Sequence, residues 1–323
     1  MEVELLLNQV DQRDLTKEEA VTLLQTENYS PDFYKILEKA NTMTRKEYGS
    51  KAYIFSQVGL NAKPCSGNCK FCSLAAGNYA VDNEFELTMK DIDCLKKMVT
   101  RLVEDGTHDI FLMTTADYPM DEYLQIGSAI RAILPERIRL VANIGDFDRQ
   151  TAEQLKAAGF TGVYHIKRLR EGIDTDLSPE LRLQTIQNVV GSGLELYYCI
   201  EPIGPEHSYE EIADEMIRAR ELNVGAMAVM RRTPVPGTAM ANAGKISAAE
   251  ITKIAAVTRL VSRPTRSMNV HEVTPMSLLA GVNQLYAEAG ANPRDQAEDT
   301  ACSRGYSVSD VVKLLQDAEY TLA

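Results

Sequence analysis

YIFSQVGLNAKPCSGNCKFC, residues 53–72, joins a short β-rich run to a loop that contains three of the chain's six cysteines. The run over residues 53–58 predicts a buried strand. Cys65, Cys69 and Cys72 follow in a C-x3-C-x2-C spacing, so all three fall within one short loop. Thiolates are the ligands that iron–sulfur clusters take. The spacing therefore predicts that the loop binds three irons of a 4Fe-4S cluster and leaves the fourth iron without a protein ligand.

An iron without a protein ligand can bind a small chelating molecule directly. S-adenosylmethionine has the amino and carboxylate groups for this, and it is the ligand that turns such a cluster into a radical generator. A structural zinc site is the alternative, but zinc would need a fourth Cys or His nearby. Cys94, Cys199 and Cys302 stand alone in the sequence. Disulfides are disfavoured, because six unevenly spaced cysteines in a long chain without a secretion signal indicate a reducing compartment.

Composition and charge are typical of an intracellular enzyme. The net charge of -12 argues against nucleic acid and anionic membrane surfaces as partners, although local basic clusters can still bind an anionic small molecule. No apolar run reaches the length of a membrane span, and the acidic first residues lack the features of a signal peptide. We therefore expect a cytoplasmic protein whose partner is a small-molecule substrate, with an anionic substrate as one option.

The order of elements predicts an α/β fold. Thr16 to Glu19 form a capping box, and Ser30-Pro31 is an N-cap followed by a proline, so we expect two helices before the first strand. After them, short apolar runs alternate with amphipathic helical segments. The expected strands are residues 53–58, 110–113, 138–142, 162–166, 194–200, 226–230, 267–270 and 285–288.

Eight uninterrupted β/α alternations predict a (β/α)8 TIM-type barrel with an N-terminal helical extension. We expect residues 1–48 to be helices that brace the barrel and residues 49–323 to be one catalytic domain, because no linker or low-complexity tract interrupts the series. Such barrels carry their chemistry at the carboxyl ends of the strands. The cysteine loop directly follows the first strand, which places it at that end.

The chain resembles the radical SAM superfamily, whose motif is C-x3-C-x-Φ-C, with an aromatic at the position of Phe71 that lies against the adenine of the cofactor. It is most similar to the biotin synthase-like branch, which includes biotin synthase, the HydE-type maturase of FeFe-hydrogenase, methylornithine synthase and the guanylylpyridinol-cofactor enzyme. The resemblance runs from about residue 15 to the C-terminus. It implies a 4Fe-4S cluster, S-adenosylmethionine and a reducing electron donor such as ferredoxin or flavodoxin.

The resemblance also implies which residues contact S-adenosylmethionine. Asp117 follows the second strand, where the family has an acidic element that accepts hydrogen bonds from the methionine amino group; the alternative is an N-cap for the helix at Met120. Glu171 and Arg182 match positions that handle the methionine carboxylate, which suits the planar fork of arginine. Ile203 and Gly204 match an element that contacts adenine.

Other polar residues at the expected strand ends are weaker candidates for substrate contacts. His165, Arg168 and Arg170 follow the fourth strand, Arg231 follows the sixth, and His271 ends the seventh. Adjacent arginines usually point to different faces, so at most one of the pair Arg231 and Arg232 need face the cavity. A single histidine at a strand end is more often a structural group.

The predicted reaction begins with reductive cleavage of S-adenosylmethionine to a 5'-deoxyadenosyl radical. The radical abstracts hydrogen from a small polar substrate for rearrangement, cleavage or addition in cofactor or unusual amino-acid biosynthesis. Sulfur insertion, as in lipoyl synthase or biotin synthase, is the first alternative. Only Cys199 matches a ligand of biotin synthase's auxiliary cluster, and a buried cysteine needs no special role. The second alternative is a non-catalytic iron–sulfur scaffold, which would not need the polar strand ends seen here.

Overall fold

Eight parallel strands close into a barrel in the computed structural model, which describes residues 2–61, 63–77, 92–287 and 306–323. Each strand pairs with its neighbour in chain order, and β1 pairs with both β2 and β8, so the predicted (β/α)8 fold is confirmed. The strands are β1 (Lys51–Gly59), β2 (Asp109–Met113), β3 (Arg139–Asn143), β4 (Gly162–Tyr164), β5 (Glu195–Ile203), β6 (Ala226–Arg231), β7 (Ser267–Val270) and β8 (Gln284–Ala287). A short strand, β9 (Thr321–Leu322), pairs with the start of β1.

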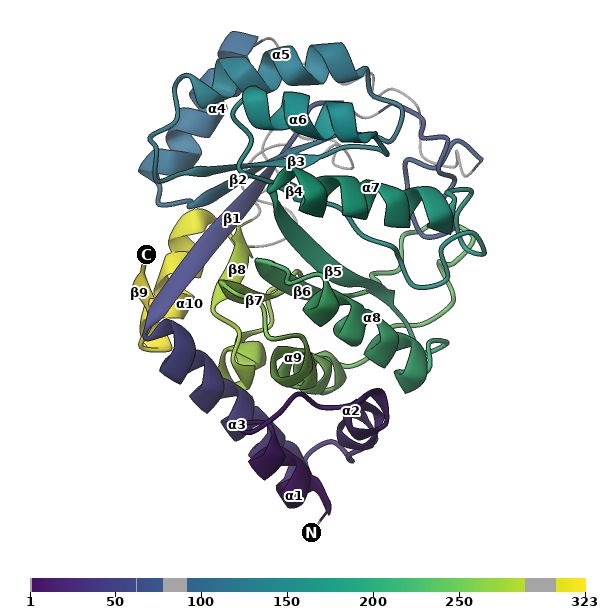
Figure 1. The fold of residues 1–323 in the computed structure, drawn as a ribbon, viewed down its shortest axis with the longest axis vertical. Helices are drawn as coiled ribbons and strands as arrows, with labels where there is room; N and C mark the ends of the chain where they lie inside the picture. The colour runs from purple at the N-terminus through teal and green to yellow at the C-terminus, as the bar shows by residue number, and fades with distance from the viewer. Residues whose placement is uncertain (1, 62, 78–91, 288–305) are drawn as a thin grey trace.

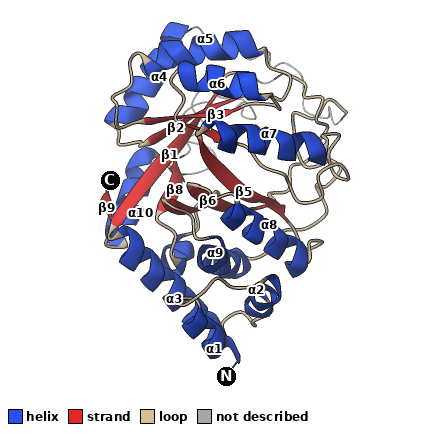
Figure 2. Cartoon of the chain, in the orientation of Figure 1, coloured by secondary structure: helices blue, strands red, loops and turns tan. Residues whose placement is uncertain are grey.

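Helices surround the barrel, as Figures 1 and 2 show. They are α4 (Ile92–Glu104), α5 (Met120–Arg131), α6 (Arg149–Ala157), α7 (Pro179–Ser192), α8 (Tyr209–Glu221), α9 (Ala248–Ser262) and α10 (Val308–Asp317). Side-chain N-caps set several of their starts, because an oxygen there satisfies a backbone N–H that has no partner within the helix. After β7, a 3₁₀ helix, η1 (Pro275–Ala280), takes the place of an α-helix. No helix in the described ranges is long and apolar enough to cross a bilayer.

The N-terminal segment forms three helices, one more than the sequence predicted. They are α1 (Glu2–Gln9), α2 (Lys17–Leu24) and α3 (Pro31–Tyr48). Both predicted starts are confirmed: Thr16 and Glu19 form the capping box of α2, and Ser30 caps α3. Helix α3 packs beside α9 (Figure 1), where the Nε of the buried Arg259 donates a hydrogen bond to the Thr44 hydroxyl at 2.9 Å. Apolar residues of these helices and of the barrel form one core, and the domain boundary at residue 48 stays a prediction.

Strands β4 and β5 end two or more residues away from the ends that the sequence predicted. Strand β4 ends at Tyr164, and beyond it only single backbone hydrogen bonds reach β5, such as that from the Leu169 N–H to the Glu201 carbonyl at 2.9 Å. The polar run over residues 165–171 leaves the sheet, because its side chains form ion pairs at the barrel mouth. Strand β5 continues three residues beyond the predicted end and carries Glu201 to that mouth. The last residue of the predicted 285–288 strand lies outside the described ranges.

The amino-terminal end of the barrel is closed by buried side chains. Phe55, Phe111, Tyr197 and Tyr286 form an aromatic layer inside it. Below this layer the fully buried Asp109 accepts two hydrogen bonds of 2.7 Å from Arg266. The interior is therefore open to chemistry only at the carboxyl ends of the strands, where barrel enzymes hold their active sites.

Candidate functional site

The three motif cysteines lie on a loop that folds back on itself at the carboxyl end of β1. Cys65 pairs with Ala75 in an isolated parallel bridge, and the Cys65 N–H donates to the Leu74 carbonyl at 2.8 Å. The Cys72 N–H donates to the Cys69 carbonyl at 2.9 Å, which closes a tight turn between these two ligands. The backbone of this short loop is thus fixed by its own hydrogen bonds, as a preformed ligand loop requires.

One side chain and two backbone groups beyond other strands hold this loop in place. The Asp117 carboxylate, beyond β2, accepts hydrogen bonds from the Ser66 N–H, at 2.7 Å, and from the Ser66 hydroxyl. Beyond β4, the Asp174 carbonyl accepts from the Lys70 N–H at 2.9 Å. The Met240 N–H, beyond β6, donates to the Lys70 carbonyl at 3.0 Å. Three different strand ends therefore fix the position of the cysteines over the barrel mouth.

Asp117 anchors the cysteine loop, and its predicted contact with the methionine amino group stays a prediction. The alternative role as an N-cap is wrong, because α5 begins at Met120 with Pro119 in the cap position. Replacing Asp117 by alanine removes both acceptors for Ser66 and loosens the loop. We expect this variant to unfold at the wild-type temperature but to retain iron about tenfold less tightly, the effect typical of losing a group that orients a ligand.

The measurement is iron bound per chain after reconstitution and competition with a chelator. Asp117→Asn is the matched control, because its amide oxygen retains one acceptor for Ser66, so this variant should hold more iron than the alanine variant. If both variants keep all their iron and lose only affinity for S-adenosylmethionine, Asp117 is a cofactor ligand and not an anchor.

Cys69 is the most buried of the three ligands and lies near a cation. Burial raises the pKa of its thiol to about 11, and the positive charge of Arg168 opposes that rise. Iron binding therefore has to displace a proton from Cys69. Arg168 Nη1 is buried and has no hydrogen-bond partner in the described part of the chain. Three clustered thiols beside an unsatisfied guanidinium N–H fit an iron–sulfur cluster that carries an anionic ligand.

A network of buried charges surrounds Arg168. Its Nε lies 3.3 Å from a carboxylate oxygen of Glu201, and its Nη1 lies 3.8 Å from Glu171. Glu171 is buried and also accepts hydrogen bonds from the Arg168 N–H at 2.9 Å and from the Thr175 hydroxyl at 2.8 Å. Arg182 approaches the same carboxylate, with its Nε 3.8 Å away. The structure thus brings Glu171, Arg182 and Arg168 together, and their contacts with S-adenosylmethionine stay predictions.

His165 and Asp146 complete this network on the side of Arg182. The Nε2 atom of His165 lies 2.9 Å from the Asp146 carboxylate and 3.2 Å from Arg182 Nη1. Burial and then the charge of Arg182 lower the pKa of His165 to about 4, and the hydrogen bond and charge of Asp146 only partly oppose them. His165 is therefore neutral at physiological pH. It orients Asp146 and Arg182, and it adds no positive charge to the site.

The low pKa of His165 makes folding stability depend on pH. Since the ordinary pKa is 6.5, the unfolded chain binds a proton at His165 between pH 6.5 and 4 while the folded protein does not. Its contribution is complete above pH 6.5 and falls by up to about 3 kcal/mol as pH drops to 4. Urea unfolding at several pH values measures this. In His165→Gln the free energy of unfolding should fall less steeply between pH 6.5 and 4 than in the wild type. The same slope in both proteins would contradict a lowered pKa at His165.

Several other predicted residues have partners of their own. Arg231 makes two hydrogen bonds of 2.8 Å to Glu272. Gly204 packs against the ion pair of Arg232 and Glu206, and a Cβ there would lie 2.5 Å from both. The His271 ring stacks on Tyr286, with 4.6 Å between ring centroids, at the top of the aromatic layer. The predicted cofactor or substrate roles of these three residues stay predictions, as do those of Phe71 at the ligand loop and of the buried Ile203.

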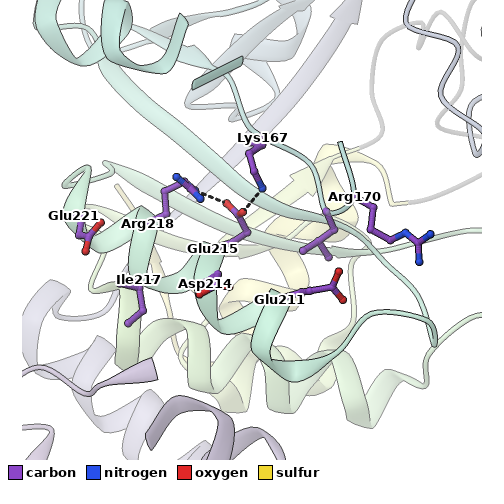
Figure 3. Close-up of a pocket in the computed structure, with 9 residues that line it drawn as sticks. Lys167, Arg170, Glu211, Asp214, Glu215, Ile217, Arg218 and Glu221 are labelled. Atoms are coloured by element: carbon purple, nitrogen blue, oxygen red, sulfur yellow. Dashed lines mark hydrogen bonds and ion pairs between the residues drawn. The ribbon is translucent and has the colours of Figure 1, made fainter. Parts of the chain in front are cut away.

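Arg170 lies outside the barrel, although it neighbours Arg168 in sequence. It lines a cavity of about 310 Å³ between the segment after β4 and the outer face of α8. Figure 3 shows Lys167 and Arg218 converging on Glu215, at 2.7 and 3.0 Å, while Arg170 extends away from them. No residue of the cysteine loop lines this cavity, and the Arg170 side chain is linked to that loop through Asp174, which lies 3.0 Å from Arg170 Nε and 3.2 Å from Lys70 Nζ.

Asp146 and Glu201 belong to the site, but the sequence analysis did not select them. Both stand at the carboxyl end of a strand, after β3 and near the end of β5. Residues at those ends face the mouth of a barrel. An acidic residue at each strand end was therefore the signal that could have found them.

The described residues offer no compact site for a single metal ion. No group of three or more His, Cys, Asp and Glu side chains in the described ranges is arranged to hold one ion. A zinc site requires such a group, whereas each thiolate of a cubane binds a different iron and so needs wider separation. Cys199 has Tyr164 and Glu201, not other thiols, as its polar neighbours.

Comparisons with known proteins agree with the motif and the barrel. The chain is 28% identical to the biotin synthase of Acetivibrio thermocellus over 265 residues, which cover 80% of this chain and 81% of that protein. Methylornithine synthase (PylB) shares the fold with a TM-score of 0.83 at 18% identity, covering 98% and 97% of the two chains.

The FeFe-hydrogenase maturase HydG of Carboxydothermus hydrogenoformans also shares the fold, with a TM-score of 0.82 at 19% identity, over all of this chain and 79% of that one. No family model matches. The sequence similarity to biotin synthases, the cysteine loop and the shared fold together support a relationship to the biotin synthase-like branch of the radical SAM superfamily.

Proposed function

We propose that the chain cleaves S-adenosylmethionine reductively and uses the resulting radical to abstract hydrogen from a small polar substrate. Rearrangement, bond cleavage or addition then follows, in the biosynthesis of a cofactor or an unusual amino acid. The observation that carries the proposal is the position of the cysteine loop, which three strand ends hold over the mouth of a closed barrel. A reduced ferredoxin or flavodoxin would supply the electron.

Cys65, Cys69 and Cys72 would hold a 4Fe-4S cluster. When bound, the cluster and S-adenosylmethionine supply one electron and a 5'-deoxyadenosyl radical. Arg168 and Arg182 would bind the methionine carboxylate, because the Nη1 of Arg168 and the Nε of Arg182 are buried without hydrogen-bond partners. Glu171 orients both guanidinium groups, because Arg168 Nη1 and Arg182 Nε each lie 3.8 Å from the same carboxylate oxygen.

The chain's other contribution is to shape the barrel interior below the cysteine loop and to exclude water from it. The aromatic layer inside the barrel blocks entry of water from the amino-terminal end. Glu201 and Asp146 present carboxylates at the mouth, where they can accept hydrogen bonds from a polar substrate. A radical enzyme needs such a closed space, because one substrate C–H bond must be held against the radical while other hydrogen sources are excluded.

Sulfur insertion has less support. An auxiliary cluster needs several soft ligands at one place. Around Cys199 the structure brings together a phenol and a carboxylate. A scaffold role also has less support. The barrel mouth contains buried polar groups without hydrogen-bond partners among the described residues, which a substrate site needs and a cluster scaffold does not.

The test is formation of 5'-deoxyadenosine by the anaerobically reconstituted protein with dithionite and S-adenosylmethionine. We expect slow release of 5'-deoxyadenosine that depends on the three motif cysteines. A protein that carries its full cluster and yields none, with or without a panel of small polar amino acids, would contradict the proposal and favour the scaffold alternative.

A further inference from the structure

A small chamber lies inside the barrel beside the aromatic layer, and Phe55, Phe111 and Tyr197 of that layer contribute to its wall. Its volume is about 20 Å³, and its lining includes Tyr164, Cys199 and Asn269. A space of this size admits a single water-sized group, provided that polar partners surround it. The chamber is therefore a specific recess below the mouth and not a general substrate pocket.

Alternation along β5 turns Cys199 toward this chamber. Tyr197 belongs to the aromatic layer inside the barrel, whereas the hydroxyl of Tyr198 points outward and donates to Glu215 of α8 at 2.6 Å. Successive strand residues face opposite sides, so Tyr197, Cys199 and Glu201 share the inner face. Cys199 is only 1% exposed, and Tyr164 and Glu201 are polar neighbours that influence the pKa of its thiol.

A continuous row of side chains connects Cys199 to the ligand loop. The charge of Arg168 acts on the Cys69 thiol, Arg168 Nε lies 3.3 Å from a carboxylate oxygen of Glu201, and the charge of Glu201 acts in turn on the Cys199 thiol. The thiol of Cys199 thus lies two side chains below the most buried cluster ligand. A substrate seated at the mouth would have the cofactor on one side and this thiol on the other.

Asn269 gives independent evidence that the chamber receives a ligand group. Its amide N–H donates to the Gln284 carbonyl at 2.7 Å, which fixes the orientation of the amide. Its Oδ1 is buried without a hydrogen-bond partner in the described residues, and the residue is only 2% exposed. An unsatisfied buried acceptor is costly unless a donor from a ligand or a water completes it.

We propose that Cys199 is a catalytic residue that gives a hydrogen atom to a carbon radical formed at this mouth. The inference rests on the proposed function. The S–H bond of Cys199 breaks, a C–H bond forms on the radical, and a thiyl remains on Cys199. The reduced electron donor then returns one electron, and solvent returns one proton. Tyr164 and Glu201 act as positioning residues that hold the thiol.

The chemistry of the recess suits this role. An S–H bond is weaker than an alkyl C–H bond, so transfer to a carbon radical is downhill. Cys199 can donate a hydrogen atom as a thiol but not as a thiolate. Burial and then the charge of Glu201 raise the pKa of Cys199 well above its ordinary value. Cys199 therefore stays protonated at physiological pH.

The experiment uses the substrate-free reaction in D2O with S-adenosylmethionine and dithionite. The thiol exchanges to S–D, so a 5'-deoxyadenosyl radical quenched by Cys199 becomes 5'-deoxyadenosine with one deuterium, which mass spectrometry detects. We expect Cys199→Ser to lower the deuterated fraction about tenfold, because its stronger O–H bond raises the barrier to transfer while its hydroxyl preserves the hydrogen bonds. Cys94→Ala, at an exposed site on α4, should match the wild type.

Equal deuterium in the Cys199→Ser and wild-type products would overturn the inference, as would wild-type product without deuterium. The absence of 5'-deoxyadenosine both in this reaction and with the panel of small polar amino acids would instead refute the proposed function, and the inference would fall with it. A second readout needs no cluster: in the folded apoprotein at pH 8, iodoacetamide should modify Cys94 and spare Cys199. Rapid alkylation of Cys199 would show an accessible thiolate and would also overturn the inference.

Discussion

Alanine at Cys69 should abolish both cluster binding and cleavage of S-adenosylmethionine, with a loss of at least about 100-fold in the rate of 5'-deoxyadenosine formation. Cys69 is the most buried motif cysteine, and its backbone carbonyl closes the turn to Cys72. Only the side chain changes in this variant, so the fold should remain. The measurements are iron per chain, the visible absorption of the cluster and product formation.

Cys94→Ala and Cys199→Ala are the matched controls for this prediction. Each removes one thiol outside the ligand loop, and each should keep the full iron content. Loss of iron in the Cys199 variant would mean that a second cluster exists, which would revive the sulfur-insertion alternative. Full iron content in Cys69→Ala would contradict the assignment of the ligand loop.

Alanine at Asp109 should destabilise the protein more than any substitution at the barrel mouth discussed above. Asp109 is fully buried and accepts hydrogen bonds of 2.7 Å from two Arg266 nitrogens and from Gln284. Its removal leaves the Arg266 guanidinium, whose side chain is only 13% exposed, without its carboxylate. Breaking a buried ion pair in this way typically costs about 3–5 kcal/mol. Chemical denaturation of the apoprotein, or thermal unfolding where it is irreversible, measures the loss.

The control for Asp109 is Asp214→Ala. Asp214 forms an ion pair of 2.6 Å with Lys17, but its side chain is about half exposed. Exposed pairs contribute at most about 1 kcal/mol, so this variant should unfold close to the wild type. Comparable effects of the two variants would mean that the Asp109 pair does not hold the base of the barrel closed.

Sequence patterns predicted the barrel well because its strands are short, apolar and separated by clear helical segments. Residues 267–270 were predicted as a strand and coincide with β7. Helix α1 was missed, since it has no capping signal comparable to Thr16 of α2. The end of β4 was misjudged because the polar run after Tyr164 forms tertiary ion pairs that local propensity does not encode.

The site was only partly predictable for a similar reason. The cysteine spacing is local, so it identified the ligand loop without knowledge of the fold. Glu201 and Asp146 become neighbours of Arg168 and Arg182 only when the carboxyl ends of β3, β4 and β5 meet at the barrel mouth. Arg170 was grouped with Arg168 by sequence, yet it lines the outer cavity beside α8. Long-range closure of the sheet, not residue type, decides these positions.

The most direct test of the central claim is electron paramagnetic resonance of the reduced, reconstituted protein before and after addition of S-adenosylmethionine. A cluster held by Cys65, Cys69 and Cys72 has one iron open to this ligand, so its g values should shift on addition. An unchanged spectrum from a protein that carries its full complement of iron would show that the fourth iron does not bind S-adenosylmethionine, and it would contradict the radical mechanism.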